Sequence, residues 1–164
     1  TPSTAYCYSQ LDGKTTFISQ SASMLARKGI ILVNSAGNEG IGTWKKINFP
    51  ADATDIISVG AIRPDSVNAA FSSIGNTVDG RIKPDVMAPG APAAVITGKG
   101  SISEDMGTSF AAPVVCGMVA CLWQANPTKT ATEIISIVRN SASQSASPDN
   151  IFGYGIANFE TKKK

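Results

Sequence analysis

The 164-residue sequence contains no histidine. Histidine is the one side chain whose unperturbed pKa lies near neutral pH, so its absence excludes a histidine general base, a histidine metal ligand and a histidine pH switch within the chain. The three cysteines, Cys7, Cys116 and Cys121, contain no C-x-x-C pair and cannot supply four zinc thiolates. We therefore expect no metal and no cofactor. We expect the cysteines to be small buried hydrophobic residues, with one pairing that uses Cys7 left open.

Charge is scarce as well. Charged residues make up 16% of the chain, against about 25% in an average domain, and the net charge is +2. Such a small charge gives no field that would indicate nucleic acid or an anionic membrane as the main partner.

The longest apolar stretch, residues 110–123, carries Pro113 and Gly117 and is shorter than the roughly 20 residues of a membrane span. We expect it to form a buried core helix that tolerates Pro113 if this residue lies in the first turn.

Segments typical of strands and helices alternate along the chain. Residues 18–28 place apolar side chains on one helical face, and Gly29 follows as a stop signal. Three apolar runs, residues 30–33, 56–62 and 85–88, are typical of strands that are covered on both faces. Strands buried on both faces and followed by helices predict an α/β fold with a parallel sheet.

Two further segments complete the predicted architecture. Residues 94–97 and 101–103 flank a loop with two glycines, which predicts a small surface hairpin. A capping box at residues 130–133 predicts the start of another helix. At this length one core can bury about 70% of the unfolded surface, so residues 1–164 are expected to form one domain or one large part of a domain.

Two residues stand in surroundings that suit catalysis. Ser109 lies between Gly107 and the start of the apolar helix, where backbone N–H groups would favour a developing anion. A serine that merely caps the helix would have the same surroundings. Asn38 lies between two glycines, where asparagine is commonly a turn residue. Taken singly, neither residue predicts a function.

Three motifs taken together are more specific. They are S-A-G-N-E-G at residues 35–40, D-V-M-A-P-G at residues 85–90 and G-T-S-F-A-A-P at residues 107–113. In this order and at these separations they resemble the subtilisin-like serine proteases, or subtilases, most of all the bacterial ones. The likeness extends over about residues 11–159, and A-A-F-S-S-I-G at residues 69–75 resembles the family's Ser-rich segment. The resemblance implies the C-terminal part of a subtilisin-like parallel sheet with helices on both faces.

The resemblance also implies roles for individual residues. Ser109 matches the catalytic nucleophile, which attacks the scissile carbonyl of a peptide, and its backbone N–H would be one oxyanion donor. Asn38 matches the side-chain amide that supplies the other donor. Ser35, Ala36 and Gly37 would line one wall of the substrate-binding pocket for the residue that precedes the cleaved bond.

The chain departs from the family in one respect. Subtilases carry the catalytic triad in the order Asp, His, Ser, and the aspartate and histidine motifs lie upstream of everything that matches here. Without a histidine, Ser109 has no general base within the chain, and Val114, where many relatives have a non-catalytic histidine, does not explain the missing base. We therefore interpret residues 1–164 as roughly the C-terminal half of a catalytic domain, inactive alone. Asp85, in a strand that frames the site, is expected to be structural.

A half domain would need a partner. Without the upstream strands, one sheet edge and apolar helix faces would be exposed, and these favour pairing. The partner could be the N-terminal piece of the same polypeptide, a second copy of this chain or another shielding element. A peptide or protein is expected as the substrate. A secreted or cell-envelope location is expected from the family alone, because no signal peptide occurs in the sequence.

Other functions remain as hypotheses. A pseudoprotease or binding scaffold would keep the fold without catalysis, and an upstream Asp-x-Gly and His-Gly-Thr segment would favour the enzyme over this alternative. An esterase of the α/β-hydrolase type is disfavoured, because the segment at residues 107–111 ends in alanine and no histidine follows it. A phosphate-binding loop at residues 98–101 is disfavoured, because Ala94 stands where that motif requires glycine.

Overall fold

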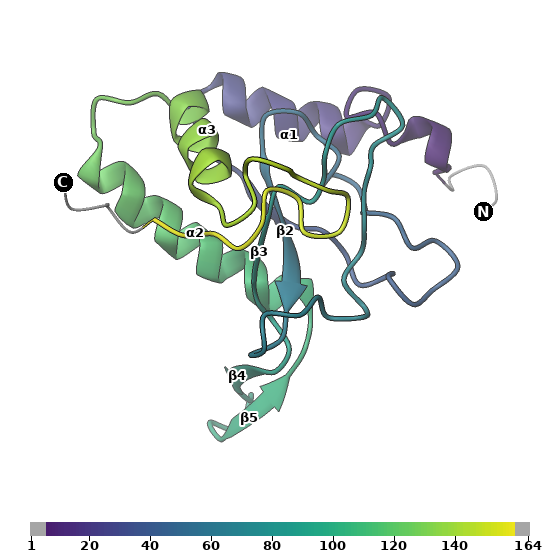
Figure 1. Ribbon diagram of the computed structural model, residues 1–164, viewed down its shortest axis with the longest axis vertical. Coiled ribbons are helices and arrows are strands. Elements are labelled where there is room, and N and C mark those ends of the chain that lie inside the picture. Colours follow the sequence, from purple (N-terminus) through teal and green to yellow (C-terminus); the bar gives the residue numbers. More distant parts are fainter. Residues whose placement is uncertain (1–5, 160–164) are drawn as a thin grey trace.

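The computed structural model describes residues 6–159 and contains a small parallel sheet with helices around it (Figure 1). The strands of the sheet, paired in this order, are β1 (Val33–Ser35), β2 (Ile57–Ile62) and β3 (Val86–Pro89). The helices are η2 (Tyr8–Gln10), α1 (Phe17–Arg27), α2 (Thr108–Ala125) and α3 (Ala131–Ser141). The antiparallel hairpin of β4 (Ala93–Ile96) and β5 (Ile102–Asp105) projects from the end of the molecule away from α1 (Figure 1). The predicted α/β class and the predicted hairpin are both confirmed.

Helices cover both faces of the sheet. Val59 of β2 lies in one hydrophobic cluster with Val115 of α2 and Ile134 of α3. Ile56, just before β2, lies in a separate cluster with Ala22 of α1. Successive side chains of a strand point to opposite faces, so α1 lies on the face opposite to α2 and α3. The prediction of helices on both faces is therefore confirmed.

The predicted strand at residues 30–33 begins too early. The N–H of Ile30 donates to the carbonyl of Leu25 at 3.1 Å, so this residue still belongs to the turn that ends α1. Gly29 forms that turn with a φ of +80°, as its place after the helix predicts. Pairing with β2 starts at Leu32, whose carbonyl accepts from the N–H of Ile57 at 2.9 Å. The apolar run thus continues from a helix turn into a strand.

The predicted buried helix at residues 110–123 is longer and less buried than expected. In the part of the chain that the structure describes, α2 is the one helix long and apolar enough to cross a membrane by length and composition, a test that core helices also pass. Residues such as Ala111 and Val115 are buried, whereas the side chain of Val114 is 44% exposed. Pro113 is the sixth residue of α2, so it lies in the second turn and not in the first. It leaves the carbonyl of Ser109 without its usual intrahelical donor.

The expectation of buried cysteines is wrong. Cys7, Cys116 and Cys121 are all exposed, and all three are free thiols. Cys116 and Cys121 lie on the outward side of α2, which no other element of residues 6–159 covers completely. Their exposure follows from the open face of this helix and not from any polarity of the residues.

Asp85 holds the beginning of β3 to the rest of the fold. Its side chain is 1% exposed, and Oδ2 accepts hydrogen bonds from Ser58 Oγ at 2.8 Å and from Lys83 Nζ at 2.6 Å. Oδ1 accepts from Arg139 Nε of α3 at 2.8 Å. Burial by itself would raise the pKa of Asp85, but the charges of Lys83 and Arg139 and these hydrogen bonds hold it below its ordinary value. These contacts support the predicted structural role of Asp85.

Replacement of Asp85 by asparagine is expected to destabilise the chain strongly, because Lys83 would be left buried without a counter-charge. Removal of one partner of a buried pair costs about 3–5 kcal/mol, which lowers the Tm of a domain of this size by roughly 6–20 °C. Thermal unfolding at pH 7 measures this. The control is Asp65→Asn, which removes an exposed pair with Arg63 and should leave the Tm unchanged. Equal Tm values for Asp85→Asn and the unaltered chain would contradict the assigned role.

The same contacts predict that the thermal stability of the chain falls at low pH. The pKa of Asp85 is lower in the folded chain than in the unfolded one. The contribution of the ionised carboxylate to the stability of the fold is therefore complete above an ordinary aspartate pKa of about 3.9. The contribution is lost as the pH falls through the lowered folded pKa. The difference in Tm between the unaltered chain and Asp85→Asn should therefore shrink below about pH 4.

Candidate active site

Ser109 is the second residue of α2, and it is exposed. The backbone N–H of a residue in this position has no acceptor within its own helix. Among residues 6–159 the Ser109 hydroxyl makes no hydrogen bond. Both groups are therefore available to a ligand at a helix start, where the helix dipole favours negative charge.

Asn38 lies in the loop after β1 and contacts the start of α2. Its Oδ1 accepts a hydrogen bond from the N–H of Thr108 at 2.9 Å and another from Thr108 Oγ1 at 2.8 Å. These two bonds fix the carboxamide, and Nδ2 donates to no partner in the described part of the chain. A Cβ added at Gly107 would lie 3.3 Å from Asn38 Nδ2, so the amide nitrogen lies beside the residue that caps α2. The structure therefore brings Asn38 against Thr108, the residue immediately before Ser109.

The carboxyl ends of the strands hold this helix start in place. The N–H of Gly107 donates to the carbonyl of Gly90 at 2.9 Å, and the N–H of Gly90 donates to the carbonyl of Ile62 at the end of β2 at 3.1 Å. A Cβ at Gly90 would lie only 2.8 Å from the carbonyl oxygen of Gly107, so this close approach requires glycine. The crevice outside the carboxyl ends of parallel strands is where open α/β sheets bind ligands.

The three residues of the predicted pocket wall differ in accessibility. The N–H of Gly37 donates to Thr108 Oγ1 at 3.2 Å, so this segment also contacts the start of α2. Ser35, the last residue of β1, is half-buried. Ala36 is fully buried, and its N–H donates to the carbonyl of Val59 at 2.8 Å. The structure thus places residues 35–37 near the helix start, with the side chain of Ala36 turned into the core.

The sequence analysis missed two hydroxyl groups that hold the site together. Thr108 is fully buried, and its Oγ1 donates to Asn38 and accepts from Gly37. Ser73 is also fully buried, and its Oγ accepts from the N–H of Glu39 at 3.0 Å. The only signals for them were a threonine inside the G-T-S motif and a serine inside the Ser-rich segment. Neither signal specifies a partner.

The start of α2 presents hydrogen-bond donors, and the chain contains no histidine. Ser109 N–H and Asn38 Nδ2, which lies beside Gly107, are both donors at the start of α2, and donors of this kind can stabilise an oxyanion. No group of three or more aspartate, glutamate or cysteine side chains in residues 6–159 could hold a metal ion. Because the chain has no histidine, it does not itself contain the histidine base of a Ser-His-Asp triad.

Comparisons with known proteins identify a family for the chain. A sequence model described as the Subtilase family matches residues 4–155. Serine protease AprX of Bacillus subtilis (strain 168) is 31% identical over 154 residues, which cover 80% of this chain and 35% of that protein. Subtilisin DY of Bacillus licheniformis is 31% identical over 150 residues, which cover 89% of this chain and 51% of that protein.

The fold has a solved counterpart. The structure of the self-cleaved protease domain of PatA superposes with a TM-score of 0.69 at 24% identity, over 85% of this chain and 51% of that one. This likeness concerns the fold. The chain spans 35% of AprX and 51% of subtilisin DY, so it corresponds to only part of each curated relative. Since the family match extends over nearly all of the chain, the chain belongs to the subtilase family.

Proposed function

We propose that the chain carries the nucleophile and the oxyanion hole of a serine endopeptidase that acts on peptides or proteins. One observation carries the proposal: Asn38 is bonded through its Oδ1 to Thr108, with Nδ2 beside the cap of the helix that begins with Thr108 and Ser109. A hydroxyl and two N–H donors at a helix start suit acyl transfer. Membership of the subtilase family supports the same chemistry.

The proposed hydrolysis proceeds through an acyl-enzyme on Ser109. Ser109 Oγ bonds to the scissile carbonyl carbon, and the carbonyl oxygen becomes an oxyanion that accepts hydrogen bonds from Ser109 N–H and Asn38 Nδ2. The hydroxyl proton passes to a base and then to the leaving amine, and collapse of the intermediate breaks the peptide C–N bond and leaves the acyl group on Ser109 Oγ. Water then gives a proton to the same base and attacks the ester, and collapse of this second intermediate returns the proton to Ser109 Oγ and releases the carboxylic acid. Residues 35–37 would hold the residue before that bond. The base is supplied from outside this chain, which is inactive alone.

We further propose that the N-terminal part of the same polypeptide supplies the base and covers the open faces of this chain. β1 has a pairing partner on one side only within residues 6–159. On the outward side of α1, Phe17 is 78% exposed and Met24 is 53% exposed. The chain spans about a third to a half of the relatives' length, which leaves room for such a segment.

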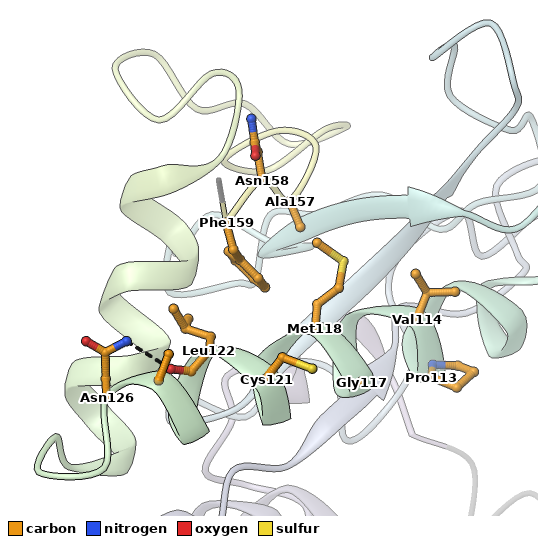
Figure 2. Close-up of a pocket in the computed structure, with 11 residues that line it drawn as sticks. Pro113, Val114, Gly117, Met118, Cys121, Leu122, Asn126, Ala157, Asn158 and Phe159 are labelled. Atoms are coloured by element: carbon orange, nitrogen blue, oxygen red, sulfur yellow. Dashed lines mark hydrogen bonds between the residues drawn. The ribbon is translucent and has the colours of Figure 1, made fainter. Parts of the chain in front are cut away.

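A further open surface lies along α2. Figure 2 shows an apolar groove between the outward side of this helix and the C-terminal segment, with Met118, Cys121 and Phe159 in its wall. Its volume is about 800 Å³. Because Ser109 is the second residue of α2, a segment seated in this groove would lie on the helix that presents the nucleophile. A secreted or cell-envelope location, expected from the family, stays a prediction.

The test compares this chain alone with the chain joined to the upstream part of its own polypeptide. An unfolded protein such as casein serves as substrate. We expect hydrolysis only by the joined protein, because only there can a base accept the Ser109 proton. Hydrolysis by this chain alone would contradict the need for an external base. A joined protein that folds, contains the upstream aspartate and histidine and still cleaves nothing would favour a pseudoprotease scaffold.

A further inference from the structure

A small polar cavity lies at the end of β3 opposite to the candidate active site. Arg81 and Lys83 precede β3, whereas Gly90, which contacts the Ser109 helix, follows it. The cavity has a volume of about 200 Å³. Its walls are formed by Thr54, Arg81, Ile82, Lys83, Arg139 and Tyr154, and we call it the basic cavity. Half of its lining residues are cations, and none is an acid.

Several donors of the basic cavity have no acceptor. Arg139 donates through Nε to Asp85 at 2.8 Å, and its two Nη groups make no hydrogen bond in the part of the chain that the structure describes. The hydroxyl groups of Tyr154 and Thr54 are likewise unpaired within residues 6–159. Arg81 Nη2 is buried and has no partner, whereas Arg81 Nη1 donates to the carbonyl of Asp52 at 2.7 Å. A buried donor of this kind is costly unless an acceptor satisfies it, while the free donors of Arg139, Tyr154 and Thr54 are accessible to a ligand from solvent.

The carboxylates near the basic cavity are already engaged. Asp79 accepts from Arg81 Nε at 2.9 Å and 3.1 Å. Asp52 accepts from the N–H of Gly13 at 2.7 Å and from Ser19 Oγ at 2.6 Å. These carboxylates do not line the cavity, so none of them is placed to accept from the donors that face it.

The cations of the cavity also act on one another. Lys83 and Arg139 both pair with the single carboxylate of Asp85. Their side chains are 2% and 27% exposed. Burial lowers the pKa of Lys83, and the positive charges of Arg139 and Arg81 lower it further, against the attraction of Asp85. These three basic side chains line one cavity, so an anion bound there would offset their like charges.

We propose that the basic cavity binds a small tetrahedral oxyanion, of the phosphate or sulfate type. Guanidinium groups present N–H donors in a planar fork that matches such oxygens, and Tyr154 adds a neutral donor. A water molecule occupies about 30 Å³ in the liquid, so the cavity holds a small ion with its waters. The bound ion would connect α3 through the free Nη groups of Arg139 with the C-terminal segment through Tyr154. Its role is to stabilise this end of the fold.

Titration calorimetry with inorganic phosphate at pH 8, against sodium chloride of equal ionic strength, tests the proposal on the folded chain. We expect saturable binding by phosphate and by sulfate, and a Tm that rises with their concentration. O-phosphoserine distinguishes a free ion from a phosphate ester, since it should bind only if the cavity admits the attached group. Chloride should produce neither effect.

Two variants keep the fold while they remove donors. Arg139→Lys keeps a positive charge beside Asp85 but loses the planar guanidinium group with its Nη donors. Tyr154→Phe loses only a hydroxyl group. We expect the first to weaken phosphate binding by about tenfold or more, as the loss of a charge-assisted hydrogen bond does, and the second to weaken it less. The control Arg63→Gln, on an exposed arginine elsewhere, should bind as the unaltered chain does. Binding that is absent, or that is equal in all variants, would overturn the proposal.

Discussion

Replacement of Ser109 by alanine is expected to abolish peptide hydrolysis by the joined protein that supplies the base. The hydroxyl is the group that forms the bond to the scissile carbonyl, and no other hydroxyl of the site is available. Thr108 Oγ1 is fully buried and already donates to Asn38. In subtilisin, a member of this family, loss of the nucleophile lowers kcat by about 2 × 10⁶, and we carry this magnitude over from that relative. Initial rates on a peptide substrate measure it.

The change at Ser109 should leave the fold intact. Its hydroxyl is exposed and makes no hydrogen bond among residues 6–159, so the Tm of Ser109→Ala should equal that of the unaltered protein. Ser103→Ala, on the exposed strand β5, is the matched control and should retain full activity. Activity that survives in Ser109→Ala would show that another group is the nucleophile, and the proposed function would then be wrong.

Replacement of Asn38 by aspartate is expected to lower kcat by about 10² to 10³ with little change in KM. The substituted carboxylate can still accept both hydrogen bonds from Thr108, but it has no N–H to donate to the oxyanion. Such a donor acts mainly in the transition state, and therefore its loss appears in kcat. The size of the effect is again taken from subtilisin, where this kind of donor was removed. Steady-state kinetics of the joined protein measure it.

Two controls separate catalysis from structure at this position. The Tm of Asn38→Asp should stay close to that of the unaltered protein, because the contacts with Thr108 are kept. Asn140→Asp changes an exposed asparagine of α3 and should leave the kinetics unaltered. An unchanged kcat in Asn38→Asp, or a loss confined to KM, would show that the amide binds substrate without stabilising the transition state.

The sequence predicts strands best where neighbours bury both of their faces. All six residues of β2 are buried, and its apolar run predicted it to within one residue. The run at residues 30–33 was less reliable, because the N–H of Ile30 is bonded to the preceding helix. Apolar character alone does not tell where a chain changes from a helical turn to an extended strand.

Burial of α2 could not be predicted from its composition. The helix is apolar on all sides, as a helix enclosed by protein would be, yet Cys116, Cys121 and Val114 are exposed. A sequence specifies that a surface is apolar, but it does not specify whether the covering segment lies within the same stretch of chain. For the same reason Cys116 and Cys121 were wrongly expected in the core.

The candidate site was predicted from the resemblance and not from periodicity. Only the order of the family's motifs indicated that Asn38 lies near Ser109, and the structure bonds Asn38 to Thr108, the residue before it. Thr108 and Ser73 were missed because a hydroxyl's partner depends on the path of a loop. The basic cavity was missed for a similar reason. Arg81 and Arg139 come together only through the packing of α3 against the beginning of β3.

A crystal structure of the joined protein with a peptidyl phosphonate on its active serine tests the central claim most directly. The phosphonyl oxygen stands in for the oxyanion of the tetrahedral intermediate. We predict a covalent bond from Ser109 Oγ to phosphorus, with that oxygen about 2.7–3.1 Å from both Asn38 Nδ2 and the Ser109 N–H nitrogen. An adduct on another residue, or an oxygen that lies beyond reach of Asn38 Nδ2, would contradict the account.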